Sequence, residues 1–301
     1  MMPNLHDIER RINSVSSTKQ ITRTMEMVAA AKIRRANERV QDATPYSESM
    51  VEMLADVAKR VGGSENALLR AHDEVKNVLV VVVVSDRGLA GGFNSNVLRH
   101  VDRLMRDRQA AGAAVKVVAC GKKAVGYYTY RKVEPVLKFA DLSADPTVEE
   151  ASAIAAYAID GYEKGELDEV ILVYNHAKNA AEQRLCEELV LPIDTAALFG
   201  EAGDAAEAAG KPELSGDVVF EPSADGVLDR LLPAYVRTTL YHGLIDSAAA
   251  EQGARRTAMK SATDNANEMV ETLTRLYNRV RQGAITTEIS EIVGGAAALE
   301  D

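Results

Sequence analysis

Residues 77–96 read NVLVVVVVSDRGLAGGFNSN, an unbroken apolar run followed by a turn that contains three glycines. The apolar run is rich in valine and shows no polar alternation, which predicts a strand buried on both faces of a sheet. A helix is expected to follow from Ser95 to about Ala110. A strand, a glycine-rich turn and a helix in this order raise the question of whether the turn holds a nucleotide phosphate.

The turn fits neither common phosphate-binding pattern. The Walker pattern needs Lys and then Ser or Thr after the last glycine, but Phe93 and Asn94 follow Gly92. The dinucleotide pattern needs G-x-G-x-x-G, and the glycines at 88, 91 and 92 have a different spacing. On these residues alone, an ordinary tight turn and a phosphate loop both stay open.

Strand and helix patterns alternate after this turn. Further strands are predicted around 115–119, 170–174 and 184–192, and a helix is predicted over 147–160, with Thr147 in its first turn or at its cap. This alternation favours a small, Rossmann-like, mostly parallel α/β domain over about residues 75–220. Within it, residues 199–217, FGEAGDAAEAAGKPELSGD, have the composition of a mobile acidic surface insertion.

Both ends of the chain carry helical heptad patterns. In the N-terminal segment, residues 1–60, the stripe runs through Leu5, Ile8, Ile12 and Val15 and resumes after one irregular step at Ile21, Met25 and Val28. In the C-terminal segment, residues 223–301, the stripe runs through Ala262, Ala266, Met269, Leu273, Leu276, Val280, Ile285, Ile289 and Ile292. The two stripes predict a long antiparallel coiled coil.

The lengths of the two helices differ. A C-terminal helix of roughly 70 residues would be about 105 Å long, which exceeds the width of a domain core. The shorter N-terminal helix would leave its far end unpaired, so we expect a shaft with the α/β domain at one end. Pro45 is expected to kink or interrupt the N-terminal helix near Thr44. Pro233, Gly243, Gly253 and Gly283 are expected to weaken the C-terminal helix without ending it.

Charge is unevenly distributed along this chain of net charge −10. Residues 187–229 hold eleven acidic residues and one basic residue, whereas residues 5–40 hold eight basic and four acidic residues. A basic stretch can face nucleic acid, an anionic membrane or an acidic protein. Because no basic cluster with interleaved aromatic residues is present, no nucleic acid partner is predicted.

Several classes of protein are disfavoured by composition. The longest apolar run has seven residues, Val78 to Val84, and no leader pattern precedes the first helix, so a soluble cytoplasmic chain is expected. Cys120 and Cys186 fit neither a metal spacing nor a disulfide framework. No cofactor or metal is predicted, because no metal-binding spacing is formed by the five histidines, His6, His72, His100, His176 and His242.

Three stretches of the chain carry a family resemblance: INSVSSTKQITRTMEMVAAAKIRRA at 12–36, SDRGLAGGFNSN at 85–96 and ATDNANEMVETLTRLYNRVRQGAITTEISEIVGGAAAL at 262–299. In these stretches the chain resembles the gamma subunits of rotary ATP synthases. The resemblance implies a central rotor shaft that couples ion-driven rotation of a membrane c-ring to ATP synthesis or hydrolysis. The implied partners are the alpha and beta subunits of the catalytic hexamer, an epsilon subunit and the c-ring. It also implies a peripheral place on the cytoplasmic face of the cell membrane, with no catalytic site of its own.

The resemblance also implies which residues contact the beta subunits. In this family the glycine-rich turn meets an acidic lever loop of beta and binds no nucleotide. The implied contact residues are Met25, Lys32, Arg34, Arg35, Arg87, Ala90, Arg281, Gln282, Thr286 and Glu288. The family often has Cys at the position of Ala90 and usually Ala at that of Gly283. From the residues alone, a solvated helix face is the favoured interpretation of the basic positions after MVAAA, and ordinary exposed pairs explain Arg281 and Glu288.

Two other functions remain open on the sequence. One is a small nucleotide-binding α/β enzyme that its helices dimerise, which would bind nucleotide as an isolated chain. The other is a coiled-coil scaffold for unrelated partners, which would show no preference for an alpha/beta hexamer.

Overall fold

The computed structural model describes residues 4–61, 66–179, 181–194, 221 and 223–300, so the acidic segment 199–217 lies outside the described residues. The chain forms two compact units, which are described separately. The first comprises Met1–Ala29 with Arg256–Asp301, and the second comprises Ala30–Arg255. Helices α1 (Leu5–Val61) and α6 (Ala224–Glu300) contribute to both units.

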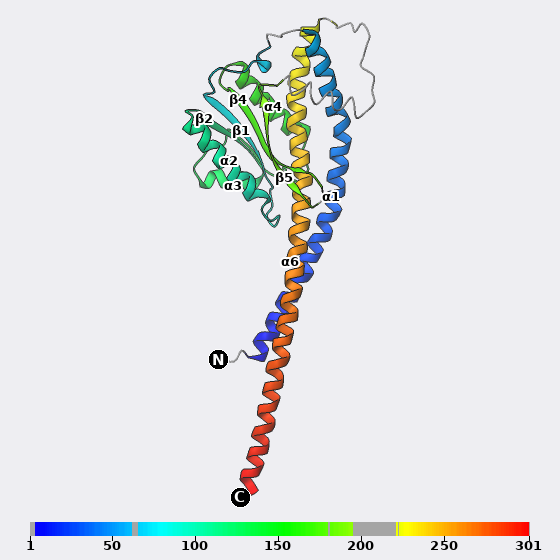
Figure 1. Ribbon diagram of the computed structural model, residues 1–301, viewed down its shortest axis with the longest axis vertical. Helices are drawn as coiled ribbons and strands as arrows, with labels where there is room; N and C mark the ends of the chain where they lie inside the picture. The colour runs from blue at the N-terminus through cyan, green and yellow to red at the C-terminus, as the bar shows by residue number, and fades with distance from the viewer. Residues whose placement is uncertain (1–3, 62–65, 180, 195–220, 222, 301) are drawn as a thin grey trace. The chain divides into compact units, whose positions relative to one another are not determined.

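The second unit is built on a five-stranded sheet in the order β3-β2-β1-β4-β5 (Figure 1). Strand β1 is parallel to β2 and β4, β2 is parallel to β3, and only β5 is antiparallel to its neighbour β4. The mostly parallel sheet is therefore confirmed. Its strands are β1 (Asn77–Val83), β2 (Ala114–Cys120), β3 (Leu137–Phe139), β4 (Glu169–Ala177) and β5 (Gln183–Leu191).

Helices cover both faces of this sheet. Helices α2 (Phe93–Ala110) and α3 (Lys122–Tyr130) pack on one face, where they meet Val78, Val80 and Val82 of β1. Helix α4 (Val148–Glu163) and parts of α1 and α6 pack on the other face, where they meet the alternate residues of β1. Because the two sides of β1 enter two different cores, the strand is buried on both faces, as its valine run predicts.

Local signals located some elements better than others. Thr147 caps α4 in a capping box with Glu150, and this confirms the helix start predicted there. Helix α2 begins at Phe93, two residues before the expected Ser95. No sequence pattern predicted α3, β3 or the short 3-10 helix Ala67–Leu69. These elements have nine, three and three residues, too few to show a clear hydrophobic period.

The expected interruption at Pro45 is wrong. Helix α1 continues through this residue to Val61, and the Thr44 hydroxyl donates to the Val40 carbonyl at 2.7 Å. Proline removes one helical hydrogen bond, but Leu54 and Val57 beyond it are buried in the core of the second unit. Packing on this later stretch keeps the helix continuous.

The first unit is an antiparallel pair of helical segments. Lys19 Nζ donates to Asn267 Oδ1 at 2.7 Å, and the Thr263 hydroxyl donates to that of Thr22 at 2.8 Å. Because rising numbers on α1 meet falling numbers on α6, the pairing is antiparallel and confirms the predicted coiled coil within this unit. Residues 285–293 of α6 are exposed, which agrees with an unpaired far end.

The seam of the helix pair differs from the predicted stripe. Ile21, Val28 and Met269 are 61%, 51% and 54% exposed, although all three were placed on the stripe. Thr22 and Ala29 lie in the seam instead and are 9% and 1% exposed. The heptad therefore continues without an irregular step, because polar side chains that bond across the pair can occupy seam positions.

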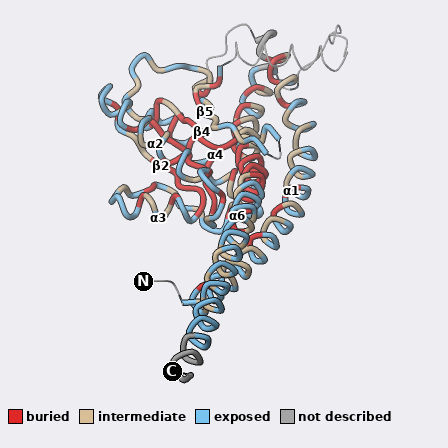
Figure 2. Tube along the Cα trace, turned by 60° about the horizontal axis from the view of Figure 1, so that its bottom comes forward, coloured by how far each residue is buried: buried red, intermediate tan, exposed pale blue. Residues whose placement is uncertain are grey.

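One stretch of α6 in the second unit is buried on all sides. All residues from 243 to 253 are buried, and Figure 2 shows this stretch of α6 in red beside the sheet. A Cβ atom added to Gly243 would lie 2.5 Å from Leu172 Cδ2 on β4. The glycine therefore allows α6 to approach the sheet closely.

Candidate functional site

The glycine-rich loop, residues 85–92, follows β1 and is held from inside the second unit. The Ser85 backbone N–H donates to Asn94 Oδ1 at 2.9 Å. The Asp86 carboxylate accepts backbone N–H groups of Lys122, Asp141 and Ser143 at 2.8, 2.9 and 2.8 Å. Although partial burial alone would raise the pKa of Asp86, these N–H donors leave it below its ordinary value. The loop is thus anchored by charge-assisted hydrogen bonds.

The tip of the loop exposes an apolar residue. Leu89 has a φ of +64° and is 63% exposed, and Arg87 is also exposed. Ala90 is 3% exposed and packs against Phe93 and Ala250. The surface that a partner would meet at this turn therefore belongs to Leu89 and Arg87, and the predicted contact through the Ala90 side chain does not fit this conformation.

The crevice where a nucleotide would lie is filled by α6. In open α/β sheets, ligands bind beyond the carboxyl ends of strands where the strand order reverses, here between β1 and β4. Ala250 of α6 packs there against Ala90 of the loop and Phe93, the first residue of α2. The Asn175 amide at the end of β4 donates to the Phe93 carbonyl at 3.1 Å. Protein side chains therefore pack against one another at this part of the crevice.

The loop also presents the wrong groups for phosphate. Arg255 Nη2 of α6 donates to the Gly88 carbonyl at 3.3 Å and to the Arg87 carbonyl at 3.5 Å. A phosphate needs converging N–H donors, whereas the loop turns carbonyl acceptors toward α6. Its Ser85 and Asp86 N–H groups are already bonded to Asn94 and Ser143. The glycine-rich turn is therefore a packing element of this fold.

Buried polar residues of α6 hold the glycine-rich loop and the end of β4 against this helix. The sequence did not predict them. Glu251 Oε1 lies 2.6 Å from Arg255 Nη2, and the two side chains are 3% and 11% exposed. Burial raises the pKa of Glu251 despite the nearby guanidinium. Asp246 accepts the Ala177 N–H at 3.0 Å and lies 2.6 Å from His176 Nδ1. Acidic and basic residues in a segment otherwise rich in alanine were the only sequence signal.

The basic stretch of α1 is exposed, as a contact surface requires. Lys32, Arg34 and Arg35 of the second unit are all exposed. Arg34 Nε lies 2.9 Å from Glu38 Oε1 one turn later, in a pair whose side chains are 85% and 54% exposed. Such a pair contributes little to stability and stays free to exchange for another anion. Met25, in the first unit, is half-buried.

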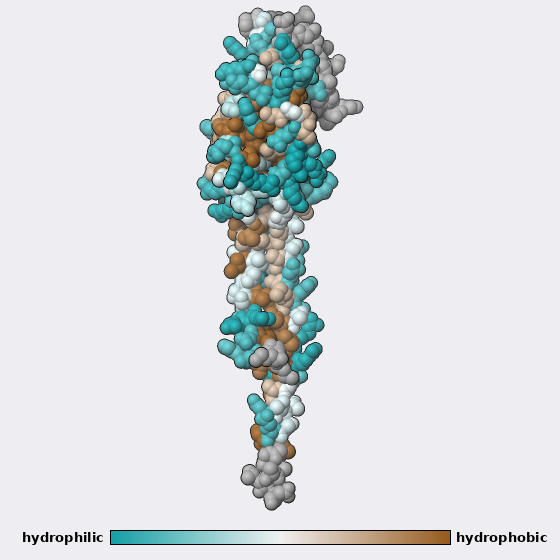
Figure 3. Space-filling view, turned by 90° about the vertical axis from the view of Figure 1, so that its left-hand side faces the viewer, coloured by the Kyte–Doolittle hydropathy of each residue, from teal (hydrophilic) through white to brown (hydrophobic). Residues whose placement is uncertain are grey.

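The predicted polar patch near the C-terminus lies on consecutive turns of α6 in the first unit. Arg281, Gln282, Thr286 and Glu288 are all exposed, and the Thr286 hydroxyl donates to the Gln282 carbonyl at 2.9 Å. A Cβ atom added to Gly283 meets nothing within 4 Å. The same stretch exposes four large apolar residues, which are Ile285, Ile289, Ile292 and Val293. Figure 3 shows brown, hydrophobic surface just before the grey terminal residues.

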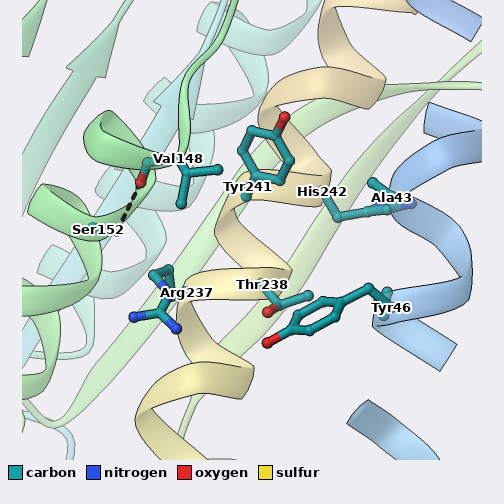
Figure 4. A pocket seen from close by; sticks show the side chains of 9 residues that line it. Ala43, Tyr46, Val148, Ser152, Arg237, Thr238, Tyr241 and His242 are labelled. Atoms are coloured by element: carbon teal, nitrogen blue, oxygen red, sulfur yellow. Dashed lines mark hydrogen bonds between the residues drawn. The ribbon is translucent and has the colours of Figure 1, made fainter. Parts of the chain in front are cut away.

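A cavity of about 370 Å³ lies between α1, α4 and α6 of the second unit (Figure 4). It contains no carboxylate and no thiol, and it includes neither the glycine-rich loop nor any predicted contact residue. Its lining consists of Ala43, Tyr46, Ser47, Val148, Ser152, Arg237, Thr238, Tyr241 and His242. The cavity therefore offers no carboxylate pair for acid–base chemistry and no Cys–His pair.

Two kinds of feature are absent from the described part of the chain. No group of three or more His, Cys, Asp or Glu residues there is arranged to hold a metal ion. None of its helices combines the length and apolarity needed to cross a membrane.

The chain has paired terminal helices and an α/β unit in which α6 packs on the glycine-rich loop. Its basic and polar helix faces are exposed. These features are typical of a coiled-coil subunit that contacts other proteins. A family model described as ATP synthase matches residues 4–299. ATP synthase gamma chains of Desulforamulus reducens and Chlorobaculum tepidum are 44% and 42% identical over 99% of this chain and 100% of their own length. The chain belongs to the ATP synthase gamma chain family.

Solved structures show the same fold. A chain in the Euglena gracilis mitochondrial ATP synthase matches with a TM-score of 0.64 and 19% identity, covering 98% of this chain and 94% of its own. A chain in the central stalk and c-ring structure of Tetrahymena thermophila mitochondrial ATP synthase matches with a TM-score of 0.57 and 24% identity, covering 80% and 99%.

Proposed function

We propose that this chain is the central rotor shaft of an ATP synthase, which couples rotation of a membrane ring to ATP synthesis or hydrolysis. Membership of the gamma chain family supports this role. The observation that carries a non-catalytic role is the packing of Ala250 and Arg255 on the glycine-rich loop, since it fills the crevice that a nucleotide would need. The chain then acts on ATP chemistry only through the subunits around it.

The proposed partners are the alpha and beta subunits of a catalytic hexamer, an epsilon subunit and the c-ring, on the cytoplasmic face of the cell membrane. The exposed cations Lys32, Arg34 and Arg35 suit an acidic loop of a partner. The uncharged sequence GGAAAL at residues 294–299 suits an apolar sleeve, in which few polar contacts resist turning.

Coupling requires contacts that differ between rotational states. A ligand or subunit shifts another only by as much as its free energy of interaction differs between two states. We propose that Arg281, Gln282, Thr286 and Glu288 form hydrogen bonds with the catalytic ring in one rotational position and release them in the next. All four residues are exposed and available for this exchange.

Replacement of both Arg281 and Gln282 by Ala tests this patch. Alanine is a good helix former, so α6 should stay folded. ATP turnover by the assembled complex should fall at least about tenfold, because charge-assisted hydrogen bonds of about 1.5 to 3 kcal/mol would be missing from one state. Two controls on the same helix are Glu268→Ala and the double change of Asn278 and Arg279 to Ala. Equal turnover in all variants, with assembly intact, would show that the patch is only solvated surface.

The rival function, a nucleotide-binding enzyme, is tested on the isolated chain. We expect calorimetry with ATP and Mg²⁺ to give no binding heat, because α6 fills the crevice. Binding that is abolished by Gly92→Val would favour the rival, since a side chain at Gly92 would come within 3.1 Å of the Asn96 amide.

A further inference from the structure

The turn at Leu89 is not explained by the preferences of its own residue. A φ of +64° is a left-handed conformation that suits glycine or asparagine and is unfavourable for leucine. The side chain is 63% exposed, so packing within this chain offsets little of that cost. Groups elsewhere in the protein must therefore hold the turn.

Helix α6 supplies those groups on both sides of the turn. Before Leu89, the carbonyls of Arg87 and Gly88 accept hydrogen bonds from Arg255 Nη2 at 3.5 and 3.3 Å. After it, Ala90 packs against Ala250, which lies five residues before Arg255 on the same helix. One short stretch of α6 thus fixes the residues that flank Leu89.

The guanidinium of Arg255 is itself fixed. Glu251 Oε1 lies 2.6 Å from Arg255 Nη2 one helical turn away, and both side chains are almost fully buried. A buried ion pair is a poor source of net stability, but Glu251 holds the guanidinium of Arg255 in the position from which it reaches the loop carbonyls.

We propose that Arg255 and Glu251 are positioning residues for the glycine-rich loop: they tie it to α6 and hold the strained turn that presents Arg87 and Leu89. The loop then moves with α6 as one body. The tie between the loop and α6 does not depend on the proposed function. Only the role of Arg87 and Leu89 rests on it, because that role is an apolar and cationic contact with the catalytic ring.

Hydrogen exchange in the isolated chain tests the tie to α6 without any partner. In Arg255→Gln, the amides of Ser85 and Asp86 should exchange at least about tenfold faster, because hydrogen bonds from a charged donor are lost. Far-ultraviolet circular dichroism should not change. Arg256→Gln, the same change at the next and exposed residue, should leave exchange unchanged. Unchanged loop exchange in Arg255→Gln overturns the proposal.

A second variant separates positioning from a general loosening of α6. Asparagine tolerates left-handed backbone better than leucine, so Leu89→Asn should slow loop exchange again in the Arg255→Gln background. If Arg255→Gln acted by unpacking α6, this second change would have no effect on exchange. Absence of rescue therefore counts against the proposal.

The assembled complex then tests the use of the loop. Arg255→Gln should lower ATP turnover of the complex at least about threefold, and Arg256→Gln should not, if a loosened loop weakens a contact with the ring. Faster loop exchange in the isolated chain together with normal turnover of the complex would uphold the tie to α6 and defeat the loop's proposed contact with the ring.

Discussion

Gly243→Ala is expected to destabilise the isolated chain because α6 and β4 meet without room for a methyl group. The new Cβ would lie 2.5 Å from Leu172 Cδ2, about 1.0 to 1.5 Å closer than the 3.5 to 4.0 Å at which carbon atoms normally pack. Leu172 is fully buried, so it has little space to yield. Overpacking of this kind costs about 1–3 kcal/mol, and the helix propensity of alanine returns about 1 kcal/mol. The net loss is therefore about 0–2 kcal/mol.

Gly283→Ala is the matched control, since the same change on the same helix meets nothing within 4 Å. The propensity gain applies to both variants, so the difference between them isolates the packing cost, about 1–3 kcal/mol. Urea unfolding of the isolated chain, followed by circular dichroism, measures both. We expect Gly283→Ala to keep or slightly raise the midpoint. Equal midpoints for the two variants would show that α6 does not depend on close approach at Gly243.

Three further predictions concern the isolated chain. Thr22→Val and Thr263→Val should each cost about 1 kcal/mol in urea unfolding, but the double variant should cost less than their sum, because both partners of one hydrogen bond are then removed. Asp86→Asn should cost about 1–2 kcal/mol at pH 7 after allowance for its partial exposure. Folding lowers the pKa of Asp86, so its contribution to the free energy of unfolding is present above the ordinary pKa of 3.8 and is lost as the pH falls through the folded pKa. Asp86→Asn lacks this group, so the variant should lose less stability than the wild type between pH 7 and pH 3. Arg34→Ala should change the free energy of unfolding by less than about 0.5 kcal/mol, since its pair with Glu38 is exposed, and a larger loss would show a structural role.

The contact residues were placed by resemblance, and the structure sorts them by accessibility. Nine of the ten predicted contact residues are exposed or half-buried, whereas Ala90 is buried against α6. No local pattern could separate Ala90 from Leu89, because both are apolar residues in the same turn. What separates them is which side chain meets Ala250, a residue 160 positions later in the chain.

The sequence by itself determined the two heptad helices, the buried strand β1 and the start of α4. Each depends on a period or cap that a few neighbouring residues supply. Only the tertiary structure decided that Thr22 takes a seam position while Ile21 is exposed, and that α6 closes the crevice beside the glycine-rich loop. The physical reason is that polar side chains can be buried where a distant partner satisfies them, as Thr263 does for Thr22 and as the carbonyls of Arg87 and Gly88 do for Arg255. Such partners lie more than 160 residues away, so no local period records them.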